Sequence, residues 1–154
     1  MTDLDDLLAS LTPDERNAVA ALDARRLEVE RARLSRVVAA QVSTPMYGAF
    51  ASLRMWDVLV RNMEDFWSAC DYYMVYEYLN MLDVRSGIEE NLAEMPTSLQ
   101  RKVERVVTDL DRRFREVTED DVGTELARYS KRVASGIDLP WWRTRKPKVL
   151  PTGW

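Results

Sequence analysis

The sequence of 154 residues contains no histidine and a single cysteine, Cys70. Without histidine the chain lacks the commonest metal ligand and the usual base of Ser/His and Cys/His nucleophile pairs. One cysteine cannot close an intramolecular disulfide or assemble a zinc site by itself. We therefore expect no metal, no cofactor and no enzymatic activity, and we interpret Cys70 as a small apolar core residue.

Long apolar runs are also missing, and the N-terminus is acidic where a secretion signal would be basic. A bilayer span needs roughly 20 consecutive apolar residues, and no segment approaches that length. With 46% hydrophobic and 31% charged residues, the composition is typical of a globular domain. We expect a cytoplasmic, intracellular protein with no membrane contact.

Glycine is scarce, with five residues, and helix signals dominate what is present. Leucines at helical spacing predict a short helix before residue 12. The stretch Thr12-Pro-Asp-Glu15 combines an N-cap, a proline at the first helical position and a capping-box glutamate. This signal predicts a second helix over residues 13–42, with a narrow apolar seam that suits one partner helix.

The next segment, residues 46–84, holds nine of the fourteen aromatic residues, and its apolar side chains fall on most helical faces. A helix that is apolar all round is usually buried at the centre of a bundle. We therefore predict one long central helix here, ended by Gly87 as the residue after its C-cap. Further helices are predicted over residues 98–117 and 118–134.

Together these elements predict an all-α protein, a helical bundle of five or six helices around one long central apolar helix. We expect a bundle domain over residues 1–138. Residues 139–154 contain three prolines and should form an extended, basic, Trp-rich C-terminal arm.

The net charge of −4 conceals an uneven distribution. The last sixteen residues carry four basic and no acidic side chains, so the rest of the chain carries 18 basic and 26 acidic groups, or −8. A cationic arm on an anionic domain favours a contact with another acidic surface. The candidate partner-binding residues in the arm are Trp141, Trp142, Arg143, Arg145, Lys146, Lys148 and Trp154.

Three roles are consistent with such an arm. It can bind another protein chain, because Trp and Arg are the residue types most often found as binding anchors. It can fold back over its own acidic domain. It can also bind single-stranded nucleic acid, since basic and aromatic residues alternate in such binders. We favour the protein partner or homo-oligomer and expect no nucleic acid, because the acidic domain repels phosphates.

A second candidate surface is the tyrosine-rich stretch that includes Tyr72, Tyr73 and Tyr76. Tyrosine has an apolar body and a polar tip, which suits a partner-binding face beside adaptable methionines. The alternative is that these phenols line the edge of the bundle core.

Three carboxylates, Asp57, Glu64 and Asp71, recur every seven residues on nearly one helical face. A carboxylate row of this kind can bind Mg²⁺ or perform acid/base chemistry. Because arginines alternate with these acids at helical spacing, we interpret the row instead as a solvated, ion-paired stripe.

We therefore expect a non-catalytic protein-protein interaction or assembly protein whose arm docks on another subunit, a structural protein analogous in general form to small helical adaptors of phage particles. The opposed charges of the two ends suit head-to-tail oligomeric assembly. The alternative is an acidic inhibitor or immunity-type protein that neutralises a basic partner. A third hypothesis is a helical enzyme that uses only carboxylates, tyrosines and arginines.

Overall fold

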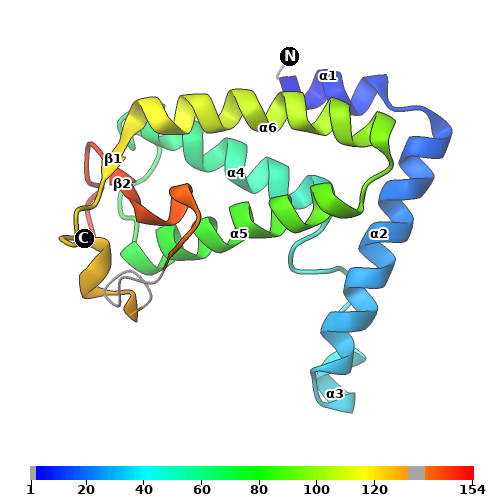
Figure 1. Cartoon of the computed structure of the whole chain (residues 1–154). Helices are drawn as coiled ribbons and strands as arrows, with labels where there is room; N and C mark the ends of the chain where they lie inside the picture. The colour runs from blue at the N-terminus through cyan, green and yellow to red at the C-terminus, as the bar shows by residue number, and fades with distance from the viewer. Residues whose placement is uncertain (1–2, 132–137) are drawn as a thin grey trace. The chain divides into compact units, whose positions relative to one another are not determined.

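The computed structural model describes residues 3–131 and 138–154 (Figure 1). Over these residues the chain forms six α-helices and one small sheet, which confirms the all-α helical class. The helices are α1 Asp3–Ser10, α2 Pro13–Ala32, α3 Arg36–Ala39, α4 Ala49–Glu64, α5 Val75–Glu94 and α6 Thr97–Val117. The sheet pairs β1 Thr118–Asp120 with β2 Arg145–Pro147, and two 3-10 turns are η1 Leu126–Arg128 and η2 Trp141–Thr144.

The chain divides into two compact units. Unit 1 comprises Met1–Arg54 and Ser86–Thr108, and unit 2 comprises Met55–Arg85 and Asp109–Trp154. The apolar residues buried in unit 1 include Leu4, Leu7, Val19, Leu22, Leu53, Ile88, Leu99 and Val103. Those buried in unit 2 include Trp56, Val60, Trp67, Tyr78, Leu82, Phe114, Leu126 and Trp142.

The start of α2 is as predicted, but its end is not. Thr12 Oγ1 accepts a hydrogen bond from the Glu15 amide, and the Glu15 carboxylate accepts one from the Thr12 amide at 2.9 Å. The helix then ends at Ala32, not near residue 42, and Ser35 caps the separate helix α3. Side-chain bonds of serine to nearby amides compete with helix continuation, and here no buried face holds the helix together.

The predicted long helix over residues 46–84 is wrong, because α4 ends at Glu64 and α5 begins at Val75. Phe66 and Trp67 adopt positive φ angles of 52° and 61°, which break the helix. This turn buries the Trp67 side chain, whose indole N–H donates to the Val149 carbonyl at 2.8 Å. A tertiary contact with the C-terminal segment has therefore overridden the helical periodicity.

Gly87 does not end a helix, since it lies inside α5. A Cβ atom at this position would lie 3.1 Å from Cβ of Tyr47. The glycine is therefore explained by the close approach of the Tyr47 side chain to the helix backbone.

The helix predicted from residue 118 is also wrong, because Thr118–Asp120 is strand β1. Its predicted end near residues 134–136 lies outside the described residues. The C-terminal segment 139–154 is only partly extended: it forms the turn η2 and the strand β2, which pairs Thr118 with Pro147 and Asp120 with Arg145. Its prolines fall where a short turn or an edge strand tolerates them.

Candidate functional site

The tryptophans of the C-terminal segment pack within unit 2. Trp142 is buried, and the Arg85 guanidinium lies 4.3 Å from the centroid of its ring. Trp141 is half-buried between Arg115, 3.7 Å from its ring centroid, and Phe114, whose ring centroid is 6.1 Å away. The Trp154 ring meets Tyr78 edge-on at 5.2 Å. The structure therefore places all three tryptophans in the second of the three predicted arrangements, folded back on their own chain.

Three of the four basic residues of the segment have partners in the same unit. Arg143 pairs with Asp83 at 2.5 Å, and Arg145 donates to Thr118 and lies 3.3 Å from Asp120. The Lys146 ammonium donates to the Thr124 hydroxyl at 3.0 Å, whereas Lys148 is exposed. The cationic C-terminal segment therefore forms its ion pairs with acidic residues of its own chain.

Arg85 and Asp111 form the buried centre of unit 2. The two side chains make two hydrogen bonds, of 2.9 and 2.8 Å, and both residues are less than a tenth exposed. The Trp56 indole N–H also donates to Asp111 at 3.3 Å. Sequence reasoning missed this pair, since neither residue differs in sequence context from the many surface charges. The Arg85–Asp111 salt bridge packs against the Trp142 ring and so ties the C-terminal segment to the helices.

Of the predicted tyrosines, two are exposed and one is not. Tyr72 and Tyr76 are 61% and 55% exposed. Tyr73 is half-buried, with its ring 4.8 Å from that of Trp67, and burial raises the pKa of its phenol above the ordinary value of 10.0. The exposed residues around them make up what we call the acidic aromatic surface: Asp65, Phe66, Asp71, Tyr72, Met74, Tyr76 and Glu77.

The C-terminal segment packs against the backbone and rings of this surface and holds them in place. The Tyr73 amide donates to the Thr152 carbonyl at 2.8 Å, and the Tyr72 ring lies against Gly153, where an added Cβ atom would be 3.0 Å away. The strained turn buries Trp67 and leaves Phe66 73% exposed. Strained backbone tends to collect at functional sites, since packing must hold it in place.

Two members of the carboxylate row are ion-paired, but the row is not the solvated stripe that we predicted, because Asp57 is buried. Asp57 accepts from Arg61 at 3.0 Å, and Glu64 accepts two hydrogen bonds, of 2.7 and 2.6 Å, from Arg113. The hydrogen bonds from Arg113 hold the pKa of Glu64 below its ordinary value of 4.5. Asp71 is exposed in the turn after α4 and does not join them. Among the described residues no group of three or more acidic or thiol ligands is placed to hold a metal ion.

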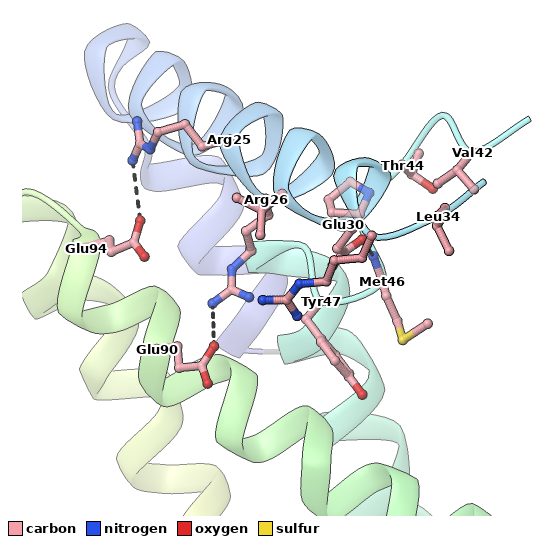
Figure 2. A pocket seen from close by; sticks show the side chains of 13 residues that line it. Arg25, Arg26, Glu30, Leu34, Val42, Thr44, Met46, Tyr47, Glu90 and Glu94 are labelled. Atoms are coloured by element: carbon pink, nitrogen blue, oxygen red, sulfur yellow. Dashed lines mark hydrogen bonds and ion pairs between the residues drawn. The ribbon is translucent and has the colours of Figure 1, made fainter. Parts of the chain in front are cut away.

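Sequence reasoning missed a groove in unit 1, with a volume of about 980 Å³, between α2, the chain that follows α3 and the end of α5 (Figure 2). We call it the α2 groove. Its lining residues are Arg25, Arg26, Val29, Glu30, Arg33, Leu34, Val42, Thr44, Pro45, Met46, Tyr47, Glu90 and Glu94. Over residues 23–47, all of which the structure describes, not one residue is buried.

Apolar side chains in and beside the groove face solvent. Val29 is 55% and Met46 69% exposed, and Leu34, Val37 and Val38 are exposed as well. The narrow apolar seam predicted over residues 13–42 indicated that this helix packs against one partner. It did not indicate that the second half of α2 is left uncovered in the folded unit. Single exposed apolar residues are ordinary, whereas a group of them beside a groove is typical of an interaction surface.

The groove is lined by charges of both signs, three arginines and three glutamates. Arg26 pairs with Glu90 at 3.0 Å, and Arg25 lies 3.7 Å from Glu94, as Figure 2 shows. The Met46 amide donates to the Glu30 carboxylate at 2.8 Å, which holds the wall of the groove in place. Residues 25–36 contain five arginines and two glutamates, a local charge of +3.

Within the described residues, no helix is both long and apolar enough to cross a membrane. The chain matches no family model, no curated protein and no solved structure. Its function must therefore be argued from the two exposed surfaces and their chemistry.

Proposed function

We propose that this chain is a non-catalytic protein that binds another protein chain, and that the α2 groove is its docking surface. The observation that carries the proposal is the stretch of residues 23–47, in which two helical pieces have no buried residue. Helices of this length draw most of their stability from a packed apolar face. A partner chain would supply the packed face that α3 and the second half of α2 lack.

The residue types of the groove support binding of a protein. Its walls combine arginine, tyrosine and methionine with aliphatic side chains. Arg and Tyr are enriched among the residues that contribute most to protein interfaces, and methionine adapts its shape to a partner. The C-terminal arm, our first expectation for the docking element, has most of its side chains engaged within unit 2, so the proposal moves to unit 1.

An acidic inhibitor remains the second candidate function, and the acidic aromatic surface is what favours it. Asp71 and Glu77 are exposed next to exposed tyrosines, which is the chemistry needed to cover a basic surface. A carboxylate enzyme has less support, since arginines hold both Asp57 and Glu64 in ion pairs.

Site-specific photo-crosslinking in the cells that make the protein tests the proposal. A photoreactive residue at Val29, which lines the groove, should form an adduct with another protein chain, identified by mass spectrometry. The matched control is Ala20, which is exposed on the same helix but outside the groove. The proposal fails if Val29 gives no adduct, or only the adducts that Ala20 gives.

A further inference from the structure

We propose that the acidic aromatic surface binds an arginine-rich segment of a partner protein. The surface belongs to unit 2, so this inference is independent of the α2 groove and of the function proposed for it. Guanidinium groups of the segment would stack on the exposed rings and pair with the neighbouring carboxylates.

The charge of the surface is the first argument. Residues 62–84 contain five acidic residues and no arginine or lysine. Arginines from other parts of the chain neutralise two of the five, Glu64 and Asp83. Among the described residues, no arginine or lysine forms an ion pair with the other three, Asp65, Asp71 and Glu77. All three are exposed, so the surface attracts and orients a cationic partner.

The hydrogen bonds that these acids already make leave their charge in place. Asp65 accepts from the Ser68 hydroxyl, and Glu77 accepts from the Met74 amide at 2.8 Å. Both donors are neutral. A carboxylate has about four lone-pair sites, so each can still accept hydrogen bonds from a guanidinium.

The rings beside these acids are the second argument, and they select arginine. Phe66 is 73%, Tyr72 61% and Tyr76 55% exposed. A guanidinium is planar and stacks on aromatic faces, and it is more weakly hydrated than the ammonium group of lysine. Acids alone would bind either cation, whereas acids next to exposed rings favour arginine.

The core of unit 2 already contains this chemistry. The Arg85 guanidinium lies 4.3 Å from the Trp142 ring centroid and pairs with Asp111 at 2.8 Å. Arg115 lies 3.7 Å from the ring centroid of Trp141. In these contacts an arginine combines with a ring or with a ring and a carboxylate. The acidic aromatic surface offers the same two groups to a cation from outside the chain.

Preorganisation is the third argument. The Trp67 indole N–H donates to the Val149 carbonyl, and the Tyr73 amide donates to the Thr152 carbonyl, each at 2.8 Å. These contacts hold the backbone of the surface before any partner arrives. A surface that is already ordered loses less conformational entropy on binding.

Fluorescence anisotropy on the full-length chain tests this inference. The probes are fluorescein-labelled nona-arginine and nona-lysine, which carry the same charge. Nona-arginine should bind about fivefold more tightly, because only its side chains stack well on the exposed rings. Its binding should weaken when NaCl is raised from about 0.05 M to about 0.5 M, because salt screens exposed charges. No binding of nona-arginine, or equal binding of the two peptides, overturns the inference.

A charge variant tests whether the peptide binds at this surface. Asp71→Lys reverses the charge of one exposed acid and should weaken nona-arginine binding about tenfold. The matched control is Glu104→Lys, which makes the same charge change at an exposed residue of unit 1. The control should bind like the parent chain at about 0.15 M salt, where distant charges are screened.

A ring variant tests the aromatic contribution separately. Phe66→Asn removes the most exposed ring, and asparagine tolerates the positive φ of residue 66. It should weaken nona-arginine binding about threefold and leave nona-lysine binding nearly unchanged. The matched control is Val122→Asn, since Val122 is also apolar, exposed and at positive φ.

Circular dichroism of each variant checks that it is folded. The inference is overturned if the two controls weaken binding as much as Asp71→Lys and Phe66→Asn do, because the peptide then responds to net charge alone. The crosslink at Val29 does not depend on these outcomes, so the two proposals fail separately.

Discussion

Substituting Asp111 with alanine should destabilise unit 2 far more than removing a surface charge. The Asp111 carboxylate accepts two hydrogen bonds from Arg85 and one from the Trp56 indole. Without it, the Arg85 guanidinium, only 4% exposed, loses both of its hydrogen bonds to the Asp111 carboxylate in the core. Removing one partner of a buried ion pair typically costs about 3–5 kcal/mol, because a buried charge is left uncompensated.

A loss of this size is a large share of the total stability. Domains of this length unfold with a free energy of about 5–15 kcal/mol. The matched control is Glu116→Ala on the same helix, which breaks the exposed 2.8 Å pair of Glu116 with Arg112. Pairs at the surface contribute only about 0–1 kcal/mol, since water already solvates both charges.

Urea unfolding followed by tryptophan fluorescence measures the difference. All five tryptophans belong to unit 2, so their emission reports the unit that contains the ion pair. The double variant Arg85→Met/Asp111→Leu should recover most of the loss, because apolar residues often replace a buried pair without penalty. If Asp111→Ala shifts the unfolding midpoint no more than Glu116→Ala does, the pair is not the structural centre we take it to be.

Two further predictions concern Glu64 and Gly153. Because Arg113 lowers the pKa of Glu64 in the folded chain, the ion pair stabilises fully above pH 4.5, and this contribution disappears as the pH falls through the lowered value. Urea titrations should show a difference in free energy of unfolding between the parent chain and Glu64→Gln. This difference should be constant near neutral pH and shrink below pH 4.5. A difference that persists in acid contradicts a stabilising ion pair between Glu64 and Arg113. Gly153→Ala should cost more stability than Gly123→Ala, although both glycines have positive φ. An added Cβ at Gly153 meets the Tyr73 carbonyl oxygen at 2.8 Å, whereas Gly123 faces open space, so equal fluorescence midpoints would refute the steric argument.

Local signals in the sequence predicted the fold class and some boundaries. The capping box at Thr12 and the regular apolar spacing of α6 depend on residues within a few positions of each other, so no tertiary knowledge is needed. The apolar residues after Thr44 predicted a buried helix. That helix is interrupted where Trp67 turns inward to the Val149 carbonyl, a contact between residues 82 positions apart. Periodicity alone cannot reveal such a contact, because it depends on where the C-terminal segment packs.

Of the candidate sites, the sequence indicated the tyrosine-rich surface but not the α2 groove. Composition singled out three tyrosines, of which Tyr72 and Tyr76 are exposed and Tyr73 is half-buried against Trp67. The groove could not be predicted, because exposure of Val29 and Met46 depends on the absence of a covering element in the folded unit. A charge count shows that residues 25–36 are basic, but not that they border a cavity.

The packing of the C-terminal segment decides which experiment tests binding at the acidic aromatic surface. Deleting residues 139–154 would remove Trp142 from beneath Arg85 and the backbone that supports Tyr72 and Tyr73. A change in peptide binding after this deletion would follow equally from the loss of four basic side chains and from a collapsed aromatic surface. Substitutions at Phe66 and Asp71 avoid this ambiguity, since both side chains are exposed and leave the supporting contacts intact. If they weaken binding while unit 2 keeps its unfolding midpoint, the segment acts as the support of the binding surface and not as the surface itself.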